Sequence, residues 1–236
     1  MPRPDAEDVL AFLRACAVFA DLPARELDAL AQAARQEPCA PREYVFHEGE
    51  PAAWFCLVRS GRIRIVRHAP AGKDVVLELL GPGEIFGGVA VLERRPYPAS
   101  AQATEPSVVV RIPADLVIAL TERQPSIART MMLLISRRLR AAHESVKSLS
   151  VDPVEARLAA TLLRLADRDG VPGPDGVALP FHLTRRSLAE MSGTTVETAI
   201  RVVSRWLREA LVADREGHLV VRDGEALRRI AEGEGG

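Results

Sequence analysis

The spacing of apolar residues changes along the chain, and each change predicts a different kind of element. Residues 5–36 carry apolar side chains at helical spacing, in two stretches that a proline separates. Residues 38–113 instead contain short β-type runs between glycines, such as Arg62–Val66, where isoleucine and arginine alternate. Short strands with turns at this spacing predict a small antiparallel barrel or sandwich, with no helix before Pro113.

Helical spacing returns over residues 122–149, and one face of this long segment carries a heptad seam. The seam comprises Met132, Ile135, Leu139, Ala142, Val146 and Leu149, which step alternately by three and four positions. This repeat is typical of helices that pack against a second helix, so we predict that it joins two copies of the chain. Packing on the helix's own domain is the alternative. Met131 and Leu134 form a second apolar edge, which is predicted to face the β-rich region.

The last part of the chain begins at Pro153, and its predicted elements follow a recognisable order. We expect, in sequence, a helix over 153–170, a turn-rich loop over 170–176, a strand over 177–183, two short helices within 184–208, a hairpin turning at 216–217 and a short terminal helix. Ala189 falls where the two short helices approach closely, and Gly193 falls in the turn between them. Helix, turn, helix and hairpin together predict a winged helix-turn-helix.

The second of these short helices separates polar from apolar residues. Its predicted polar stripe holds Glu197, Thr198, Arg201, Arg205 and Arg208. The opposite face holds Val196, Ala199, Val203, Trp206, Leu207 and Ala210. A helix with one face for a core and one for an anion fits the major groove of DNA. Thr194 and Glu197 match a capping box, so Glu197 is expected to cap the helix, to read a base, or to do both.

Charge and composition limit where nucleic acid could bind. The 236 residues carry a formal net charge of −1, so DNA binding requires a local basic patch. Residues 184–208 supply one, with five arginines against two glutamates. No apolar run approaches the roughly 18 residues that span a membrane, and the N-terminal pattern is not that of a signal peptide. We therefore expect a cytoplasmic location and no membrane partner.

The cysteines and the remaining polar residues indicate no catalytic or metal chemistry. Cys16, Cys39 and Cys56 lie far apart, so they are expected to be buried and reduced rather than ligands of a metal or an iron–sulfur cluster. The sequence presents neither a nucleophile–base pair nor metal-ligand spacing. We therefore expect no catalytic residue, no metal site and no enzyme activity.

Two groups of motifs carry a resemblance to a known family. LTRRSLAEMSG and TVETAIR lie in the predicted helix-turn-helix, and EGE, SGRIRI and LGPGEIFG lie in the β-rich region. Over about residues 15–222 the chain resembles the CRP/FNR family of transcription regulators. The resemblance implies an α+β fold, with a jelly-roll-like antiparallel β-roll of the cyclic-nucleotide-binding type over 1–121, a dimerisation helix over 122–149 and a winged helix-turn-helix over 150–236. It also implies a homodimer on an inverted repeat in double-stranded DNA, with RNA polymerase as a further partner.

The resemblance also assigns roles within the predicted reading helix. Family members carry a glutamate and an arginine four residues apart, here Glu197 and Arg201, which can read cytosine and guanine respectively. Ile200 replaces a polar residue and is expected to contact a thymine methyl group or to pack. Val196 replaces a base-reading arginine of the cyclic-AMP type, so the chain is more similar to the fumarate–nitrate type and a TGA-containing half-site is implied. The expected phosphate contacts are Thr184, Arg186, Thr195, Thr198 and Arg205.

The effector site of the family is altered in this sequence. Where cyclic-AMP-binding members carry Gly-Glu for the ribose and Arg-Ser for the phosphate, this chain has Gly87-Gly88 and Ala99-Ser100. Loss of the carboxylate and the guanidinium removes the strong charge-assisted hydrogen bonds to the nucleotide. We therefore predict control by an unidentified small molecule or by none. The expected effector pocket comprises Gly87, Gly88, Arg95, Ser100, Ala142 and His143.

Three alternatives stay open at this point. Cyclic-nucleotide control would need Arg94 or Arg95 to reach the phosphate. Haem-based gas sensing would need ligands, for which the candidates are His47, His68, His143 and Pro2, although no cofactor is predicted. The alternative function is a ligand-binding module that controls a protein partner, and such a module would not need the face that carries Glu197 and Arg201.

Overall fold

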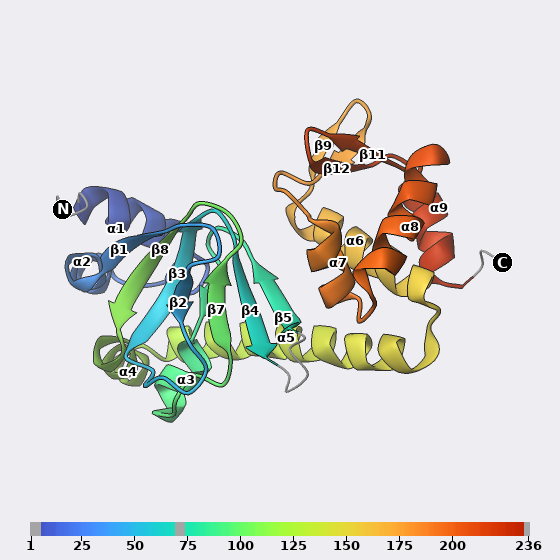
Figure 1. Cartoon of the computed structure of the whole chain (residues 1–236). Coiled ribbons are helices and arrows are strands. Elements are labelled where there is room, and N and C mark those ends of the chain that lie inside the picture. The colour runs from blue at the N-terminus through green and yellow to red at the C-terminus, as the bar shows by residue number, and fades with distance from the viewer. Residues whose placement is uncertain (1–5, 69–73, 234–236) are drawn as a thin grey trace. The chain divides into compact units, whose positions relative to one another are not determined.

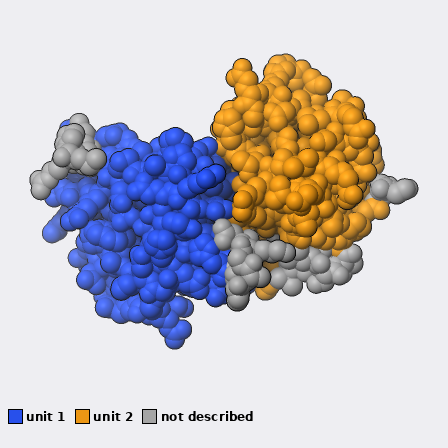
Figure 2. Space-filling view, in the orientation of Figure 1, with its two compact units in different colours: residues 1–72, 77–139 blue, residues 73–76, 140–236 orange. Residues whose placement is uncertain are grey.

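The computed structural model describes residues 6–68 and 74–233, and side chains over 7–68, 75–143 and 152–233. The chain divides into two compact units, one of residues 1–72 and 77–139 and one of residues 73–76 and 140–236 (Figure 2). The first unit holds the predicted β-rich region and the second holds the predicted winged helix-turn-helix.

Two four-stranded antiparallel sheets form the β-rich region in the described part of the chain (Figure 1). One sheet has the order β1–β8–β3–β6, built from Arg35–Cys39, Ser107–Pro113, Trp54–Ser60 and Ile85–Phe86. The other has the order β2–β7–β4–β5, built from Tyr44–Phe46, Ser100–Ala103, Ile63–His68 and Asp74–Leu80. The predicted antiparallel sandwich is therefore confirmed.

The central strand β3 is apolar without interruption because both of its faces are covered. Phe55 and Leu57 belong to a core shared with helices, while Cys56 and Val58 belong to a second core that includes residues of the other sheet. All four side chains are fully buried. A strand buried on both sides needs no polar alternation. The predicted alternation on β4 is only partly right, because Arg62 precedes the strand and is buried.

The helices of the first unit are α1 (Ala6–Ala15), α2 (Ala24–Ala33), α3 (Gly88–Glu93) and α4 (Ala114–Arg123). The prediction of helix through residue 36 is wrong, because β1 begins at Arg35. The short α3 within the β-rich region was not predicted. The long helix does not begin at residue 122 as predicted, since Gln124 leaves helical conformation at φ −127° and ψ 86°. A residue before proline is disfavoured in the α region, and this separates α4 from α5.

The long helix α5 (Pro125–Val151) has the two apolar edges that the sequence predicts. Ile127 and Met131 are buried in the core that also holds Phe55, and Leu134 packs against the same core. The described seam residues face outward: Met132 is 66% exposed, Ile135 39% and Leu139 54%, and Ala142 is also exposed. The seam residues Val146 and Leu149 lie outside the described side chains.

The second unit is built on α6 (Val154–Asp169), α7 (Arg185–Met191), α8 (Val196–Arg208) and α9 (Gly224–Ala231). Its sheet has the order β11–β12–β10–β9, built from Val212–Arg215, His218–Val221, Gly176–Ala178 and Val171–Gly173. The predicted strand over 177–183 is largely wrong, because β10 ends at Ala178, shortly before Pro180. The predicted loop over 170–176 contains β9 instead. The predicted winged helix-turn-helix order is confirmed, and the hairpin turns at Glu216 and Gly217, which both have positive φ.

In the part of the chain that the structure describes, no helix combines the length and the apolar character that crossing a membrane requires.

Candidate nucleic-acid interface

The turn between α7 and α8 is tight, for the reasons that the sequence indicates. Ala189 is 1% exposed where the two helices pack against each other. Gly193 has φ +61°, a conformation that favours glycine. The Thr194 backbone N–H donates to the Ala189 carbonyl oxygen at 3.0 Å and closes the turn. These contacts fix the direction in which α8 leaves α7 (Figure 1).

Helix α8 buries one face completely and leaves the other free. Its buried residues are Ala199, Val202, Val203 and Trp206. The exposed line opposite consists of Glu197, Ile200, Arg201, Ser204 and Arg208. The predicted core face differs in detail: it omits Val202, which is buried, and Val196 and Leu207 are only half-buried. It also includes Ala210, which lies beyond the end of the helix, exposed, at φ +57°. The separation of faces is as predicted, because an α-helix repeats every 3.6 residues.

The three candidate base-reading residues lie together on this exposed line. Ile200 is 47% exposed, which is unusual for an isoleucine on a helix with a well-packed core face. Among the described residues, the Arg201 guanidinium has neither a hydrogen bond nor an ion pair. Glu197 receives hydrogen bonds from its own backbone N–H and from the Thr195 hydroxyl, and these hold its pKa below the ordinary value. The exposed line thus presents a hydrogen-bond acceptor on Glu197, an apolar surface on Ile200 and hydrogen-bond donors on Arg201.

The predicted capping box is displaced by one residue. Thr195, not Thr194, is the N-cap of α8, and its side-chain oxygen accepts from the Thr198 backbone N–H at 3.2 Å. Glu197 is therefore the second residue of the helix, so it cannot complete the reciprocal capping box. Its carboxylate still lies at the positive end of the helix dipole, which favours its charged form.

The candidate phosphate contacts lie at the beginnings of both helices. Thr184 is the N-cap of α7 and accepts from the Ser187 backbone N–H at 3.0 Å. Thr195 and Thr198 begin α8, with their hydroxyls 3.1 Å apart. Arg186 forms an exposed ion pair with Glu190 at 2.9 Å. Such a surface pair is weak, so Arg186 can exchange it for a phosphate.

Arg205 lies differently from the other candidates. Its guanidinium forms an ion pair with Glu155 on α6, and the Trp206 indole N–H donates to the same carboxylate at 2.9 Å. This double contact anchors the core face of α8 to α6. The geometry therefore gives Arg205 a role in holding the reading helix, while its contact with a phosphate stays a prediction.

Another arginine, Arg157 on α6, holds the turn, and it is not among the residues predicted from the sequence. Arg157 donates to the carbonyl oxygens of Ser192 and Gly193 at 2.9 and 3.1 Å, and to that of Asp152 at 2.9 Å. Arg157 and Glu155 are separated in the sequence from their partners in the helix-turn-helix by 35 to 51 positions. Local sequence pattern cannot identify such contacts.

In the first unit, the altered effector cassette is closely packed. A Cβ atom on Gly88 would lie 2.8 Å from Phe55 Cε2 and 3.1 Å from Met131 Cε, which is too close for a side chain without rearrangement. Gly87 has φ +72°, and a Cβ there would lie 3.0 Å from the Tyr97 ring. A side chain at either glycine would therefore require its neighbours to move.

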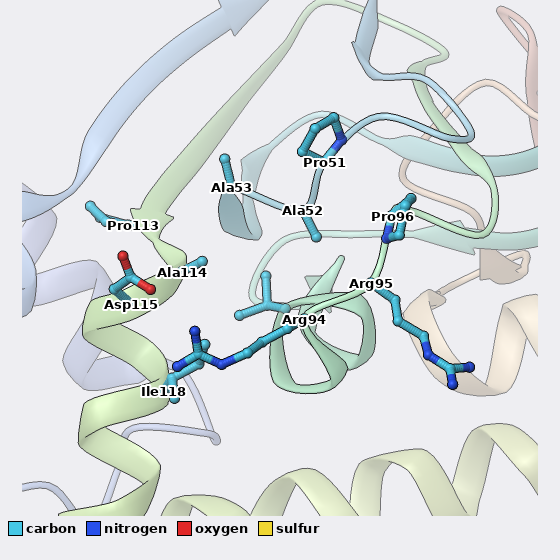
Figure 3. Close-up of a pocket in the computed structure, with 11 residues that line it drawn as sticks. Pro51, Ala52, Ala53, Arg94, Arg95, Pro96, Pro113, Ala114, Asp115 and Ile118 are labelled. Carbon is cyan, nitrogen blue, oxygen red and sulfur yellow. The ribbon is translucent and has the colours of Figure 1, made fainter.

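The other predicted pocket residues are dispersed. Ser100 is buried, and its hydroxyl accepts from the Glu48 backbone N–H at 2.9 Å. Arg95 is exposed beyond α3 and lines a cavity of about 520 Å³, which Gly87, Gly88 and Ser100 do not line (Figure 3). The cavity is bordered by residues 51–53, 91, 94–96, 113–115 and 118. Ala142 and His143 are exposed and belong to the second unit.

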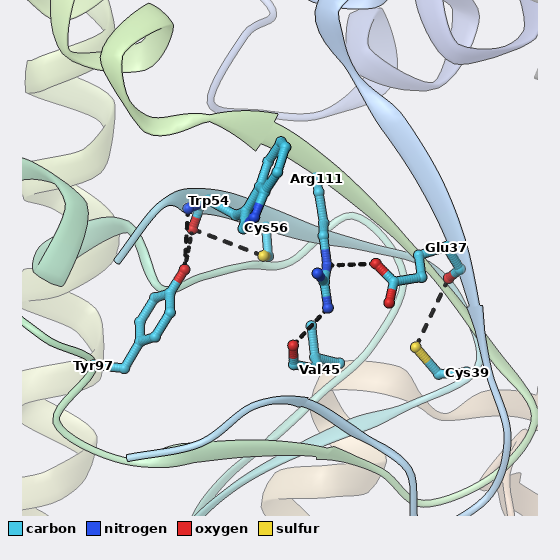
Figure 4. Close-up of polar contacts among 7 residues, drawn as sticks. All are labelled: Glu37, Cys39, Val45, Trp54, Cys56, Tyr97 and Arg111. Atoms are coloured by element: carbon cyan, nitrogen blue, oxygen red, sulfur yellow. Dashed lines mark hydrogen bonds and ion pairs between the residues drawn. The ribbon is translucent and has the colours of Figure 1, made fainter. Parts of the chain in front are cut away.

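Aromatic side chains occupy the interior of the β-roll beside the cassette. The Tyr97 ring stacks on Phe46 with centroids 3.6 Å apart. Its hydroxyl donates to the Trp54 carbonyl oxygen at 2.7 Å and accepts from the Trp54 backbone N–H at 3.1 Å (Figure 4). Nearby, Arg111 pairs with Glu37 at 2.8 Å and donates to the Val45 carbonyl oxygen at 2.5 Å. These contacts hold the two sheets together.

All three cysteines are free and buried, as predicted. Burial raises the pKa of Cys16 to about 11 and that of Cys56 to about 12, and it also raises the pKa of Cys39. Thiols in this state are poor nucleophiles and poor metal ligands.

Two of the candidate haem ligands lie at the surface beside the same tyrosine. His47 and His68 are exposed and contact Tyr44, with ring centroids 4.3 and 6.1 Å from it. No three potential metal-binding side chains cluster within the described residues. Pro2 lies outside the described residues, and haem binding stays untested.

Comparisons with known proteins agree with the two units. The model of the cyclic nucleotide-binding domain matches residues 36–124, and that of the Crp-like helix-turn-helix domain matches residues 156–230. The chain is 34% identical over 189 residues to the cyclic AMP receptor protein of Thermus thermophilus, covering 80% of this chain and 84% of that one. It is 28% identical over 200 residues to the transcriptional activator protein anr of Pseudomonas aeruginosa, covering 85% and 82%. A crystal structure of a CRP-family transcriptional regulator from Thermus thermophilus matches with a TM-score of 0.69 at 25% identity, covering 83% of this chain and 96% of that one.

Proposed function

Because the chain belongs to the CRP/FNR family of transcription regulators, we propose that two copies bind an inverted-repeat operator through their α8 helices. The family match makes the chain a DNA-binding regulator rather than an enzyme. The proposal adds the residues that read the operator, the dimer that presents them and the nature of the effector.

The observation that carries the proposal is the exposed line of Glu197, Ile200 and Arg201 on a helix whose other face is anchored. Arginine can donate two hydrogen bonds to guanine, glutamate can accept from cytosine, and isoleucine can contact the thymine methyl group. A TGA-containing half-site presents all three groups on its two strands. Base reading requires a helix that does not rotate, and the contacts of Glu155 and Arg157 supply that rigidity.

The dimer is inferred from the seam on α5. Met132, Ile135 and Leu139 are apolar and exposed, and such a row along one helix is typical of a surface that packs against a partner. A second copy carries the same row, so a two-fold axis would bury both. Two-fold symmetry places the two reading helices on half-sites about one helical turn apart.

The effector is inferred to be neither cyclic AMP nor haem. The sequence has glycine where a carboxylate would hold a ribose, and a side chain at Gly88 would require Phe55 and Met131 to move. Among the described residues, no histidine lines the cavity beside Arg95. We infer control by a different small molecule or by protein level alone, with RNA polymerase as the partner at the promoter.

The first test concerns Arg201. Replacing it by alanine should weaken operator binding by about 1–3 kcal/mol and relax the preference at one base position, because a bidentate contact to a single base is lost. Fluorescence anisotropy with the operator and with its single-base variants, at fixed salt, measures both effects.

Arg208→Ala is the matched control, since Arg208 is also exposed on α8 but lies in its last turn. It should change affinity little and equally for every sequence. If Arg201→Ala weakened binding to all sequences equally, Arg201 would contact phosphate only and the base-reading assignment would be wrong.

The second test concerns the effector. Cyclic AMP at millimolar concentration should leave operator affinity unchanged, because the cassette lacks both charged partners of the nucleotide. Anisotropy with and without cyclic AMP measures the operator affinity. Calorimetric titration and native mass spectrometry of the purified protein measure whether cyclic AMP binds. Saturable cyclic AMP binding that raises operator affinity would contradict the inference.

A further inference from the structure

Two histidines from distant parts of the second unit lie against each other. The rings of His182, just before α7, and His218, at the start of β12, have centroids 4.2 Å apart and planes inclined by 40°. A Cβ atom on Gly217, in the wing turn, would lie 2.4 Å from His182 Nδ1. Glycine at this position therefore allows both the positive φ of the turn and the close approach of His182.

The pair lies where the wing meets the helix-turn-helix. Asp214 on β11 accepts from the Gly217 backbone N–H at 2.9 Å and pairs with Arg185 on α7 at 3.0 Å. This carboxylate ties the wing turn to the first residue of α7. His182 is exposed and stands two residues before Thr184, one of the predicted phosphate contacts. The imidazole pair is thus adjacent to the surface on which the DNA backbone is expected.

We propose that His182 and His218 together form a binding site for a DNA backbone phosphate that is strong only when an imidazole is protonated, so that operator affinity rises as the pH falls. The proposal rests on the proposed function, that is, on operator binding by this unit. The ligand class is a phosphodiester, and the two histidines supply the donors.

The chemistry follows from the charge of imidazole. Among unperturbed side chains, histidine alone changes its charge between about pH 5 and 8. A charge-assisted hydrogen bond to phosphate is about twice as strong as a neutral one. Bound phosphate therefore favours the protonated form, and by linkage each additional proton taken up raises affinity by up to about tenfold per pH unit.

Several charged groups lie on the elements around the pair. The charged groups on the surrounding elements are Asp214 and Arg215 on β11, Glu216 in the turn and Arg185 on α7. Asp214 is paired with Arg185, and Arg215 is paired with Asp175. Glu216 is exposed at the turn.

The test measures operator affinity of the full-length protein by fluorescence anisotropy between pH 6 and pH 8, at several salt concentrations. The wild type should bind about tenfold more tightly at pH 6 than at pH 8. Its plot of log affinity against log salt should steepen by about 0.9 at the lower pH, as expected for one more phosphate contact. A contact that only supports the fold would leave this slope unchanged.

Two variants separate charge from shape. His182→Gln combined with His218→Gln keeps hydrogen-bonding groups but removes the titratable charge, so both the pH effect and the change in salt slope should vanish. The other three histidines remain in this variant and report their own contribution. His182→Lys places a fixed charge at the same position and should bind at pH 8 as tightly as the wild type does at pH 6. This variant still provides a test if the double replacement does not fold.

The possible results distinguish failure of the histidine phosphate site from failure of operator binding itself. Operator preference that is equally pH-dependent in the wild type and in the double glutamine variant would overturn the phosphate site and leave the regulator function intact. Lack of operator preference at every pH would overturn both.

Discussion

Replacement of Leu139 by glutamate is expected to convert the protein from dimer to monomer and to weaken palindrome binding by about 10²–10⁴-fold, the usual advantage of linked binding. Leu139 lies on the described part of the seam and is 54% exposed in the single chain. In a two-fold dimer its replacement would place two carboxylates against each other in an apolar interface, where unpaired charge is costly. Sedimentation equilibrium measures the dimer, and anisotropy measures the binding.

Leu133→Glu is the matched control for this result. Leu133 lies on the same helix and is also 54% exposed, but its position is outside the heptad seam. The control should remain dimeric and bind the palindrome. A Leu139→Glu protein that stayed dimeric would show that the seam is not the interface.

Replacement of Trp206 by alanine is expected to lower the free energy of unfolding of the second unit by about 3–5 kcal/mol. Trp206 is fully buried, so its loss leaves a large cavity in the core of the helix-turn-helix. It also removes the hydrogen bond that links α8 to Glu155. Urea denaturation followed by circular dichroism measures the change in the free energy of unfolding.

The two tryptophans make this measurement specific to one unit. Trp54 is in the first unit and Trp206 is in the second, so in the variant the remaining fluorescence reports the first unit alone. That transition should be unchanged. Trp206→Phe keeps an aromatic ring in the core but loses the smaller ring of the indole together with its N–H. It should therefore cost less than the alanine replacement, about 1–2 kcal/mol. Equal stability of the alanine variant and the wild type would contradict the packing of α8 described here.

The parts of the fold that could be predicted from the sequence are those that repeat locally. The core face of α8 and the two edges of α5 follow from helical periodicity, because burial selects apolar residues at a fixed spacing. Gly193 marked the turn because its backbone conformation favours glycine. The displaced capping box shows the limit of this reasoning, since Thr194 and Thr195 are chemically equivalent and the cap depends on where the helix begins.

The parts that could not be predicted depend on partners far along the chain. Arg205 belongs to the same helical stripe as Arg201, yet Glu155 on α6 binds the former and not the latter. His182 and His218 are 36 positions apart and meet only because the wing folds back onto α7. In the effector cassette, the sequence shows that Gly88 carries no carboxylate, but only the fold shows that Phe55 and Met131 pack against this glycine.

The central claim is that paired α8 helices read a specific operator, and one affinity ratio tests it most directly. The purified wild-type protein is titrated by anisotropy against a palindrome with TGA-containing half-sites and against scrambled DNA of the same length and composition, at the same salt concentration. The account predicts that the palindrome is bound more tightly by about 4–10 kcal/mol, or roughly 10³–10⁷-fold. A ratio near one would contradict it.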